Sequence, residues 1–263
     1  MNYAGLPPIR RARDYHLYDR GGRRYLDLCL AGGRALLGHK PRGLYKILKN
    51  EFQKGLAAEF PTAFEKRFEK ALLGLAPPGC TVRLYASFDS ALGAAGTILG
   101  RTITGADILE PFFAAGKWTP VYYRPFTNID YSRFSILFPV LPFPGNFAPQ
   151  PLLLREQAPP PGDAVSPLLL AGLARLAEEL KNGLEFPDMW KEWRLPGWKR
   201  FGCYCFPPLE AEEAYARAYS RFLEEGIVLS PQARRPSILP RLYSPGERRL
   251  VERLSERILG SGT

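Results

Sequence analysis

A cluster of hydroxyl and carboxylate side chains, Ser87-Phe-Asp-Ser-Ala91, stands where an expected strand at Val82–Tyr85 gives way to a run of small residues that suits a tightly packed helix. Hydroxyls and free backbone amides at the start of a helix can hold an anion. Ser87 and Ser90 are therefore candidate anion contacts. The competing interpretation is local, because Asp89 or Ser90 could act as the N-cap of the same helix.

Histidines and cysteines, the usual metal ligands, are few. There are two histidines and four cysteines, and His39 stands in a Gly-His turn where a structural role is expected. Four scattered cysteines cannot form a disulfide framework. Cys203-Tyr-Cys205 has no second close pair or histidine nearby, so no metal site is predicted. Alternation along a strand would put both thiols on one face, where we expect them to be buried and free.

The charge balance is strongly basic. The chain of 263 residues has 36 lysines and arginines against 26 acidic residues, a formal net charge of +10. Such a balance favours anionic partners such as nucleic acid, phosphorylated ligands or acidic surfaces. The arginines form separate clusters, however, at Arg10–Arg13, Arg20–Arg24 and Arg234–Arg235.

Hydrophobic periodicity predicts interleaved helices and strands, and hence an α/β fold. Asp19-Arg-Gly-Gly22 indicates a hairpin turn within residues 15–28. Helices are expected at Leu44–Lys54, Ala63–Leu75, Ser87–Gly100, Ser166–Leu180, Glu210–Glu225 and Pro245–Leu259. Besides Val82–Tyr85, strands are expected at Leu26–Leu30, Ile227–Leu229 and Ile238–Tyr243. Ser166 is expected to cap its helix, with Pro167 in the first turn.

Residues 111–161 are rich in proline and aromatic side chains. Proline is excluded from helix interiors and from central strands, so this segment is expected to form short extended pieces and ordered loops. Its aromatic content argues against disorder. Lys181–Phe201 is a tryptophan-rich linker in this interpretation.

The length suits one sizeable domain or two modest ones with a substantial core. Apolar residues make up 46% of the chain, but no uncharged apolar run is long enough to span a bilayer. Met1-Asn-Tyr-Ala-Gly-Leu-Pro-Pro8 lacks the apolar core of a secretion signal. A cytoplasmic location is the expectation.

The opening residues resemble a known enzyme family. Tyr15–Leu28, followed by Leu37-Gly-His-Lys-Pro41, is similar to the N-terminal region of class III aminotransferases, which include glutamate-1-semialdehyde aminomutase and acetylornithine aminotransferase. Val82–Ala91, Thr104–Leu109, Ser166–Leu180 and Glu225–Pro231 follow the same family in order. The resemblance implies a pyridoxal phosphate (PLP) enzyme of fold type I.

The resemblance implies a reduced form of that fold, truncated and degenerate. Residues 1–60 would form an N-terminal arm and part of the small domain. Residues 61–182 would form an abbreviated large domain containing the proline-aromatic segment 111–161. Residues 183–263 would complete the small α/β domain, which is thus made from N- and C-terminal segments.

The sequence departs from the family at the cofactor phosphate. The family has Ser-Gly-Ser/Thr-Glu-Ala before its cofactor helix, where the glycine lets the backbone approach the phosphate. Here Phe88 places a ring at that position, and Asp89 places a carboxylate close to where a dianion would lie. Ser87 and Ser90 are the remaining candidate cofactor contacts.

The catalytic residues of the family have no clear counterparts. Its Tyr-His-Gly segment and its Asp-Glu pair are missing, and Lys117 is the only lysine between Leu109 and Ser166. Lys117 matches no family motif, which makes it a poor candidate for the Schiff-base lysine. Without that lysine and the aspartate that holds the ring nitrogen, transamination is not expected. The expected set of catalytic residues is therefore empty.

Three functions follow as hypotheses. The first is a non-catalytic aminotransferase-like protein that binds a ligand or partner, in which Arg34, Arg235 and Arg241 are candidate anion contacts. Arg241 lies where the family often offers an arginine to the substrate carboxylate, although ion-paired surface arginines are the alternative. The second is an active PLP enzyme with relocated chemistry. The third is a basic anion- or nucleic-acid-binding protein. The resemblance also implies a homodimer, or pairing with a full-length aminotransferase.

Overall fold

The computed structural model describes residues 3, 5–143, 148–155, 160–183, 187–209 and 211–259. The chain forms two compact units. Unit 1 comprises Met1–Pro41, Phe126–Asn128 and Phe186–Thr263, and unit 2 comprises Arg42–Pro125 and Ile129–Glu185.

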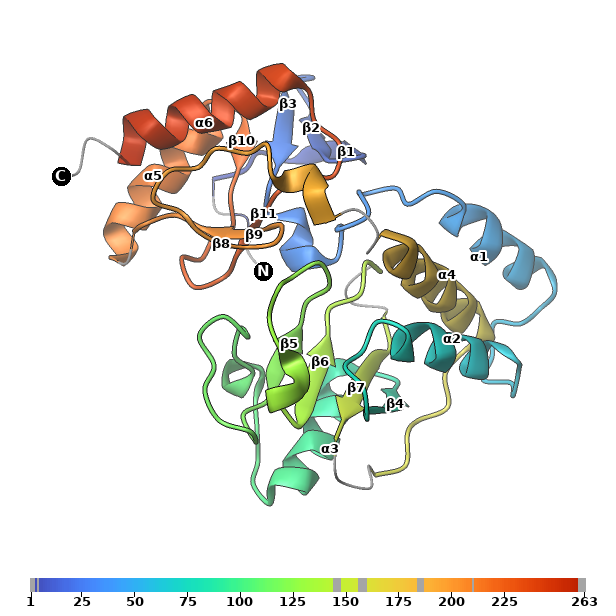
Figure 1. Cartoon of the computed structure of the whole chain (residues 1–263). Coiled ribbons are helices and arrows are strands. Elements are labelled where there is room, and N and C mark those ends of the chain that lie inside the picture. Colours follow the sequence, from blue (N-terminus) through green and yellow to red (C-terminus); the bar gives the residue numbers. More distant parts are fainter. Residues whose placement is uncertain are drawn as a thin grey trace. The chain divides into compact units, whose positions relative to one another are not determined.

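Unit 1 is built around a four-stranded sheet that joins the two ends of the chain (Figure 1). Its order is β1-β2-β3-β10, with β1 at Ile9–Arg13, β2 at His16–Asp19, β3 at Arg24–Asp27 and β10 at Ile227–Val228. The first three strands are antiparallel, and β10 is parallel to β3. The predicted hairpin is confirmed, since the Asp19 carboxylate accepts a hydrogen bond from the Arg23 amide across the turn.

A small second sheet and two helices complete unit 1. The sheet consists of β8 (Lys199–Phe201), β9 (Tyr204–Phe206) and β11 (Ser237–Ile238). Helix α5 (Glu212–Glu224) packs against β10 and against α6 (Pro245–Leu259), and both helices lie close to where the periodicity predicts them. Cys203 and Cys205 are buried free thiols, which confirms that expectation.

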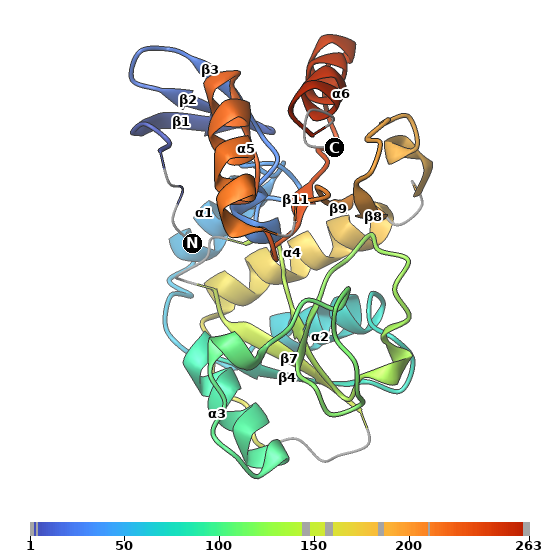
Figure 2. The same cartoon turned by 90° about the vertical axis from the view of Figure 1, so that its left-hand side faces the viewer.

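Unit 2 is a sheet covered on both faces by helices. Its order is β4-β7-β6-β5, with β4 at Thr81–Tyr85, β7 at Gln150–Leu154, β6 at Ile136–Pro139 and β5 at Val121–Tyr123. Helix α3 (Phe88–Leu99) packs its alanines onto one face. The other face lies toward α2 (Phe64–Leu73), since the Tyr123 hydroxyl donates to the carbonyl oxygen of Leu75. Helix α4 (Pro167–Gly183) packs on α2 and on α1 (Leu44–Gln53) (Figure 2).

The expectation that residues 111–161 contain no central strand is wrong, because β6 and β7 are the two central strands of this sheet. They tolerate Pro139 and Pro151 because their mutual ladder pairs only Ile136–Leu137 with Leu153–Leu154. Beyond that point the buried side-chain amide of Gln150 donates to the carbonyl oxygens of Pro139 and Pro151, at 3.1 and 2.9 Å. A side chain thus supplies donors that proline lacks.

Three other expectations need correction. The strand expected at Leu26–Leu30 stops at Asp27, because Leu30 and Ala31 adopt positive φ angles in a tight turn. The strand expected at Ile238–Tyr243 is only Ser237–Ile238. The Ser166 hydroxyl caps nothing, since it is buried without a hydrogen-bond partner among the described residues.

A buried ion pair fixes the start of the proline-aromatic segment. The guanidinium of Arg124 donates to both carboxylate oxygens of Glu110, at 2.5 and 2.6 Å, and both side chains are at most 4% exposed. The Tyr131 hydroxyl accepts from the Arg124 amide at 3.0 Å. Two charges leave water here only because each neutralises the other in a bidentate geometry.

Removing one member of this pair should strongly destabilise unit 2. We expect Arg124→Met to lower the free energy of unfolding by about 3–5 kcal/mol, because Glu110 would remain buried without a counter-charge. The double variant Glu110→Leu/Arg124→Met should recover much of that loss. Urea denaturation followed by circular dichroism measures both. The control is Arg67→Met, which breaks an exposed pair with Glu178 and should change stability by less than about 1 kcal/mol.

Candidate functional site

Ser87 and Ser90 both make hydrogen bonds at the start of α3. Ser87 is the N-cap, with its hydroxyl oxygen 3.0 Å from the Ser90 amide and 3.1 Å from the Ser90 hydroxyl oxygen. The cap is therefore Ser87, and not Asp89 or Ser90 as expected. Both serines are exposed. The structure brings the two hydroxyls together, but they hydrogen-bond to each other and to the helix backbone.

Phe88 is half-buried beside this turn. Its ring lies 5.9 Å from that of Phe138 and packs against the buried cluster between α3 and the sheet. A methyl group added to Gly105 would lie 3.4 Å from the same ring. The Phe88 ring thus fills the space between Phe138 and Gly105.

No lysine is enclosed. All ten lysines of the chain lie in the described part and all are exposed. Lys117, the lysine considered for a Schiff base, has its ammonium 5.8 Å from the ring centre of Trp118. Amine nucleophiles are activated by desolvation or by a neighbouring cation, and exposure provides neither.

Arg34, Arg235 and Arg241, the candidate anion contacts, all belong to unit 1. Arg34 follows the 3₁₀ turn Leu30–Gly33, which packs against β11. Arg235 precedes β11, and Arg241 follows it. The Ile238 amide donates to the Leu28 carbonyl at 2.6 Å, which ties these two parts of the backbone together. Each arginine is partly exposed and makes contacts within the protein.

The Gly-His turn is structural. His39 Nε2 lies 2.8 Å from Oδ2 of Asp27, a fully buried carboxylate. The other oxygen of Asp27 accepts from the amides of Cys29 and Leu30, at 2.8 and 3.0 Å. Leu30 and Ala31 have φ angles of 45° and 49°, which side chains rarely adopt. Asp27 therefore holds a strained turn in place.

Nucleophiles in this region stay protonated. Burial, together with the charge of Asp27, raises the pKa of Cys29 to about 12. Burial likewise raises the pKa of Tyr219 to about 12, with smaller contributions from Cys29 and Asp27. The thiolate and the phenolate are the attacking forms of these groups, and burial disfavours both.

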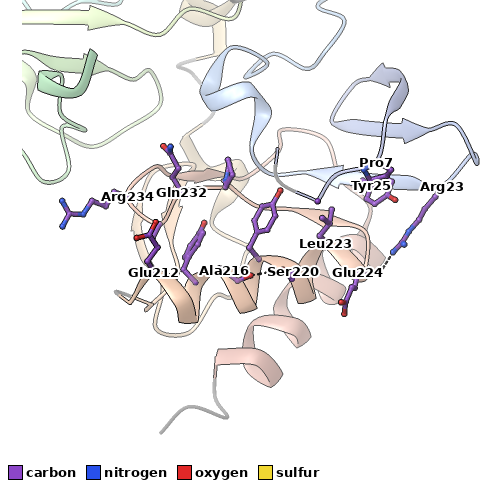
Figure 3. Close-up of a pocket in the computed structure, with 15 residues that line it drawn as sticks. Pro7, Arg23, Tyr25, Glu212, Ala216, Ser220, Leu223, Glu224, Gln232 and Arg234 are labelled. Carbon is purple, nitrogen blue, oxygen red and sulfur yellow. Dashed lines mark hydrogen bonds between the residues drawn. The ribbon is translucent and has the colours of Figure 1, made fainter. Parts of the chain in front are cut away.

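A groove of about 1030 Å³ runs along α5 in unit 1. Figure 3 shows Glu212 and Arg234 near one end and Arg23 and Glu224 near the other. Arg23 donates to the backbone carbonyl of Glu224, which connects the β2–β3 turn to the end of α5. The groove mixes both signs of charge, an arrangement that suits binding of a polar ligand or segment. Its residues come from segments far apart in the chain, so no local sequence pattern marks the groove.

A second carboxylate joins the sheet of unit 1 to α6. Glu247 Oε1 lies 2.7 Å from His16 Nε2 and 3.1 Å from a guanidinium nitrogen of Arg24. The other oxygen accepts from the Ser244 amide at 2.7 Å. Burial acts to raise the pKa of Glu247, but the hydrogen bonds from Ser244 and His16 outweigh it, and the pKa lies below its ordinary value of 4.5.

The described residues do not fit the cofactor that the family resemblance implies. The Ser87 hydroxyl already accepts a hydrogen bond from the Ser90 amide as the helix cap. The Phe88 ring lies beside it and packs against the core, and the lysines are exposed.

In the described part of the chain, no group of three or more histidine, cysteine or acidic side chains could hold a metal ion. No helix in the same residues is long and apolar enough to cross a membrane.

Comparison with known sequences finds two uncharacterized proteins that match most of this chain and most of their own length, and a named enzyme that matches part of it. No protein-family model matches the chain. An uncharacterized protein of Borreliella burgdorferi is 28% identical over 92% of this chain and 87% of its own length. One from Treponema pallidum is 25% identical over 89% of each chain. Glutamate-1-semialdehyde 2,1-aminomutase of Methanococcus maripaludis is 31% identical over 41% of this chain, and the match spans only 25% of that enzyme.

Solved structures define the fold class. Acetylornithine aminotransferase from Elizabethkingia anophelis superimposes with a TM-score of 0.62 over 99% of this chain and 95% of its own, at 12% identity. A glutamate-1-semialdehyde aminomutase from Pseudomonas aeruginosa gives 0.64 over 96% and 87%, at 13% identity. The chain therefore has the α/β fold of PLP-dependent aminotransferases of fold type I, in a shorter form. The predicted fold class is confirmed.

Replacing Glu247 should weaken unit 1 in a pH-dependent way. Because the folded-state pKa is depressed, the ionised carboxylate adds stability above its ordinary value of 4.5, and this is lost as the pH falls through the lower folded value. We expect Glu247→Gln to lower the midpoint of thermal unfolding at pH 7, with the difference from wild type narrowing toward pH 3. Equal differences at both pH values would contradict this role. Glu256→Gln, on an exposed position of α6, is the control.

Proposed function

We propose that this chain is a non-catalytic protein on the aminotransferase fold that acts as a binding or partner protein and forms no Schiff base with PLP on its own. The exposure of all ten lysines carries this proposal. A Schiff-base lysine works in an enclosed site where water is excluded and its amine is deprotonated. The first turn of α3 supports the same proposal, since the Phe88 ring packs against the core and the Ser87 hydroxyl accepts from the Ser90 amide.

Anionic ligands are the class that unit 1 would bind in this proposal. Arg34, Arg235 and Arg241 flank the contact between the Leu30–Gly33 turn and β11, and arginine presents a planar fork suited to carboxylates and phosphates. The buried Asp27 carboxylate holds this turn by hydrogen bonds, so the backbone from which the Arg34 side chain extends is fixed. In this view the protein keeps the binding framework of the fold without its chemistry.

The alternative function is an active PLP enzyme that uses Lys117. Purified protein incubated with PLP and then dialysed should show no absorption band of its own in the near-ultraviolet and visible region, because no enclosed amine retains the cofactor. A stable band that is lost in Lys117→Ala but kept in Lys181→Ala would overturn the proposal. Lys181 is a matched control, being another exposed lysine of unit 2.

Self-association is the second part of the proposal. Tyr45 and Phe52 lie one heptad apart on α1 and are 72% and 65% exposed. Large apolar side chains gathered on one helix face favour a protein partner. We propose a homodimer, with pairing to a full-length aminotransferase as the variant.

Light scattering coupled to gel filtration tests the homodimer. Wild type should elute at twice the chain mass of 29.5 kDa, and Tyr45→Ser/Phe52→Ser should shift the population toward the monomer by at least tenfold in dissociation constant. Leu242→Ser, which removes a 60% exposed leucine from unit 1, should leave the mass unchanged. A monomeric wild type that forms a complex with an added aminotransferase would favour the variant.

A further inference from the structure

The antiparallel strands β1, β2 and β3 carry the densest positive charge in unit 1. Residues 9–25 contain six arginines and two aspartates, with no lysine and no glutamate. Strand β1 is the edge of the sheet, and four of its five residues are exposed. Most of these arginines therefore point into solvent rather than into a core.

The strand register places an arginine–tyrosine–arginine row on one face. Arg11 of β1 is opposite Tyr18 of β2, and Tyr18 is opposite Arg24 of β3. Residues directly opposite each other in a sheet share a face. The next residues along, Leu17 and Tyr25, face the other way into the core that α5 covers. The row Arg11–Tyr18–Arg24 thus lies on the face turned away from that core.

This row is stacked and only partly neutralised. The guanidinium of Arg11 lies 4.2 Å over the ring centre of Tyr18. Arg24 is paired with Glu247 but is 56% exposed. Arg10 and Arg20, at the bulge of β1 and in the β2–β3 turn, are exposed and have no ion pair or side-chain hydrogen bond among the described residues. The charge of the surface therefore remains available to a ligand.

We propose that this surface of β1–β3 binds single-stranded nucleic acid. Arginine stacks on bases and binds phosphate bidentately, whereas lysine acts as a point charge, and the segment contains arginine alone. The guanidinium of Arg11 above the Tyr18 ring offers, with that ring, a surface on which a base can stack. Arg11 and Arg24 are two strand spacings apart, about 9.5 Å, so each can hold a phosphate on either side of that base.

Other polyanions fit this surface less well. Docking on an anionic membrane calls for leucine, phenylalanine or tryptophan side chains that enter the bilayer. The outward row of β1–β3 offers none of these. This proposal is independent of PLP binding, because it uses only side chains of strands β1–β3. Nucleic-acid binding and the absence of a PLP Schiff base can therefore each be disproved without affecting the other.

Fluorescence anisotropy with labelled oligouridine and oligothymidine tests the proposal. Wild type should bind with an affinity that falls as salt rises. Arg10→Ala/Arg11→Ala/Arg20→Ala should bind at least tenfold more weakly, and its slope of log affinity against log salt should be smaller by about 2, since each phosphate contact to a single strand contributes about 0.7. The two probes separate a preference for RNA from one for DNA.

Matched variants make the result specific. Tyr18→Phe should bind like wild type, whereas Tyr18→Ala should lose about tenfold in affinity because the stacking surface is removed. Arg217→Ala changes an exposed arginine on α5, across the sheet, and should have no effect. Circular dichroism establishes whether each variant is folded. If the triple arginine variant does not fold, the comparison of Tyr18→Phe with Tyr18→Ala tests the proposal by itself.

Three outcomes would overturn the proposal. They are wild-type protein that binds neither probe, binding that is insensitive to salt, and a triple variant or Tyr18→Ala that binds like wild type. Retention on phosphatidylserine vesicles that oligouridine fails to displace would assign the surface to a membrane instead.

Discussion

The buried pair between Glu110 and Arg124 determines how the middle of this chain can fold. Two charges that are almost fully removed from water must meet in one geometry, and that geometry brings the start of the proline-aromatic segment to the end of β5. In the unit 2 sheet β6 lies next to β5, and β7 and β4 follow. A segment with too many prolines for regular ladders is thereby incorporated into a layered α/β unit, with Gln150 supplying donors where the ladder stops.

Hydrophobic periodicity and turn-forming residues predict those helices and turns that depend mainly on neighbouring residues in the sequence. Periodicity located α1, α2 and α6 within a few residues, and glycine located the β2–β3 turn. The same rules failed for β6 and β7, where Pro139 and Pro151 keep their register with Tyr123 of β5 and Leu84 of β4 but take no part in the ladder between the two strands. Here the ladder between them involves two residue pairs, so Pro139 and Pro151 lie beyond it. The length of this ladder depends on how segments distant in the sequence pair, and the sequence pattern alone does not predict that pairing.

The candidate site shows the same division between local and distant information. The sequence shows Phe88 where the resembling family has a glycine, and the structure adds that its ring packs against the core. The choice of Ser87 as the cap over Asp89 was not predictable, since either residue type serves. The groove along α5 and the row on β1–β3 depend on strand register and helix placement, and register is fixed only when the apolar faces meet their core.

One short segment has a consequence for how the protein is assembled. Phe126–Asn128 belongs to unit 1, although the chain on both sides of it belongs to unit 2. It passes so close to the β8–β9 turn that a side chain at Gly202 would overlap the carbonyl of Phe126. Each unit is therefore discontinuous in sequence, and neither can be obtained by cutting the chain once.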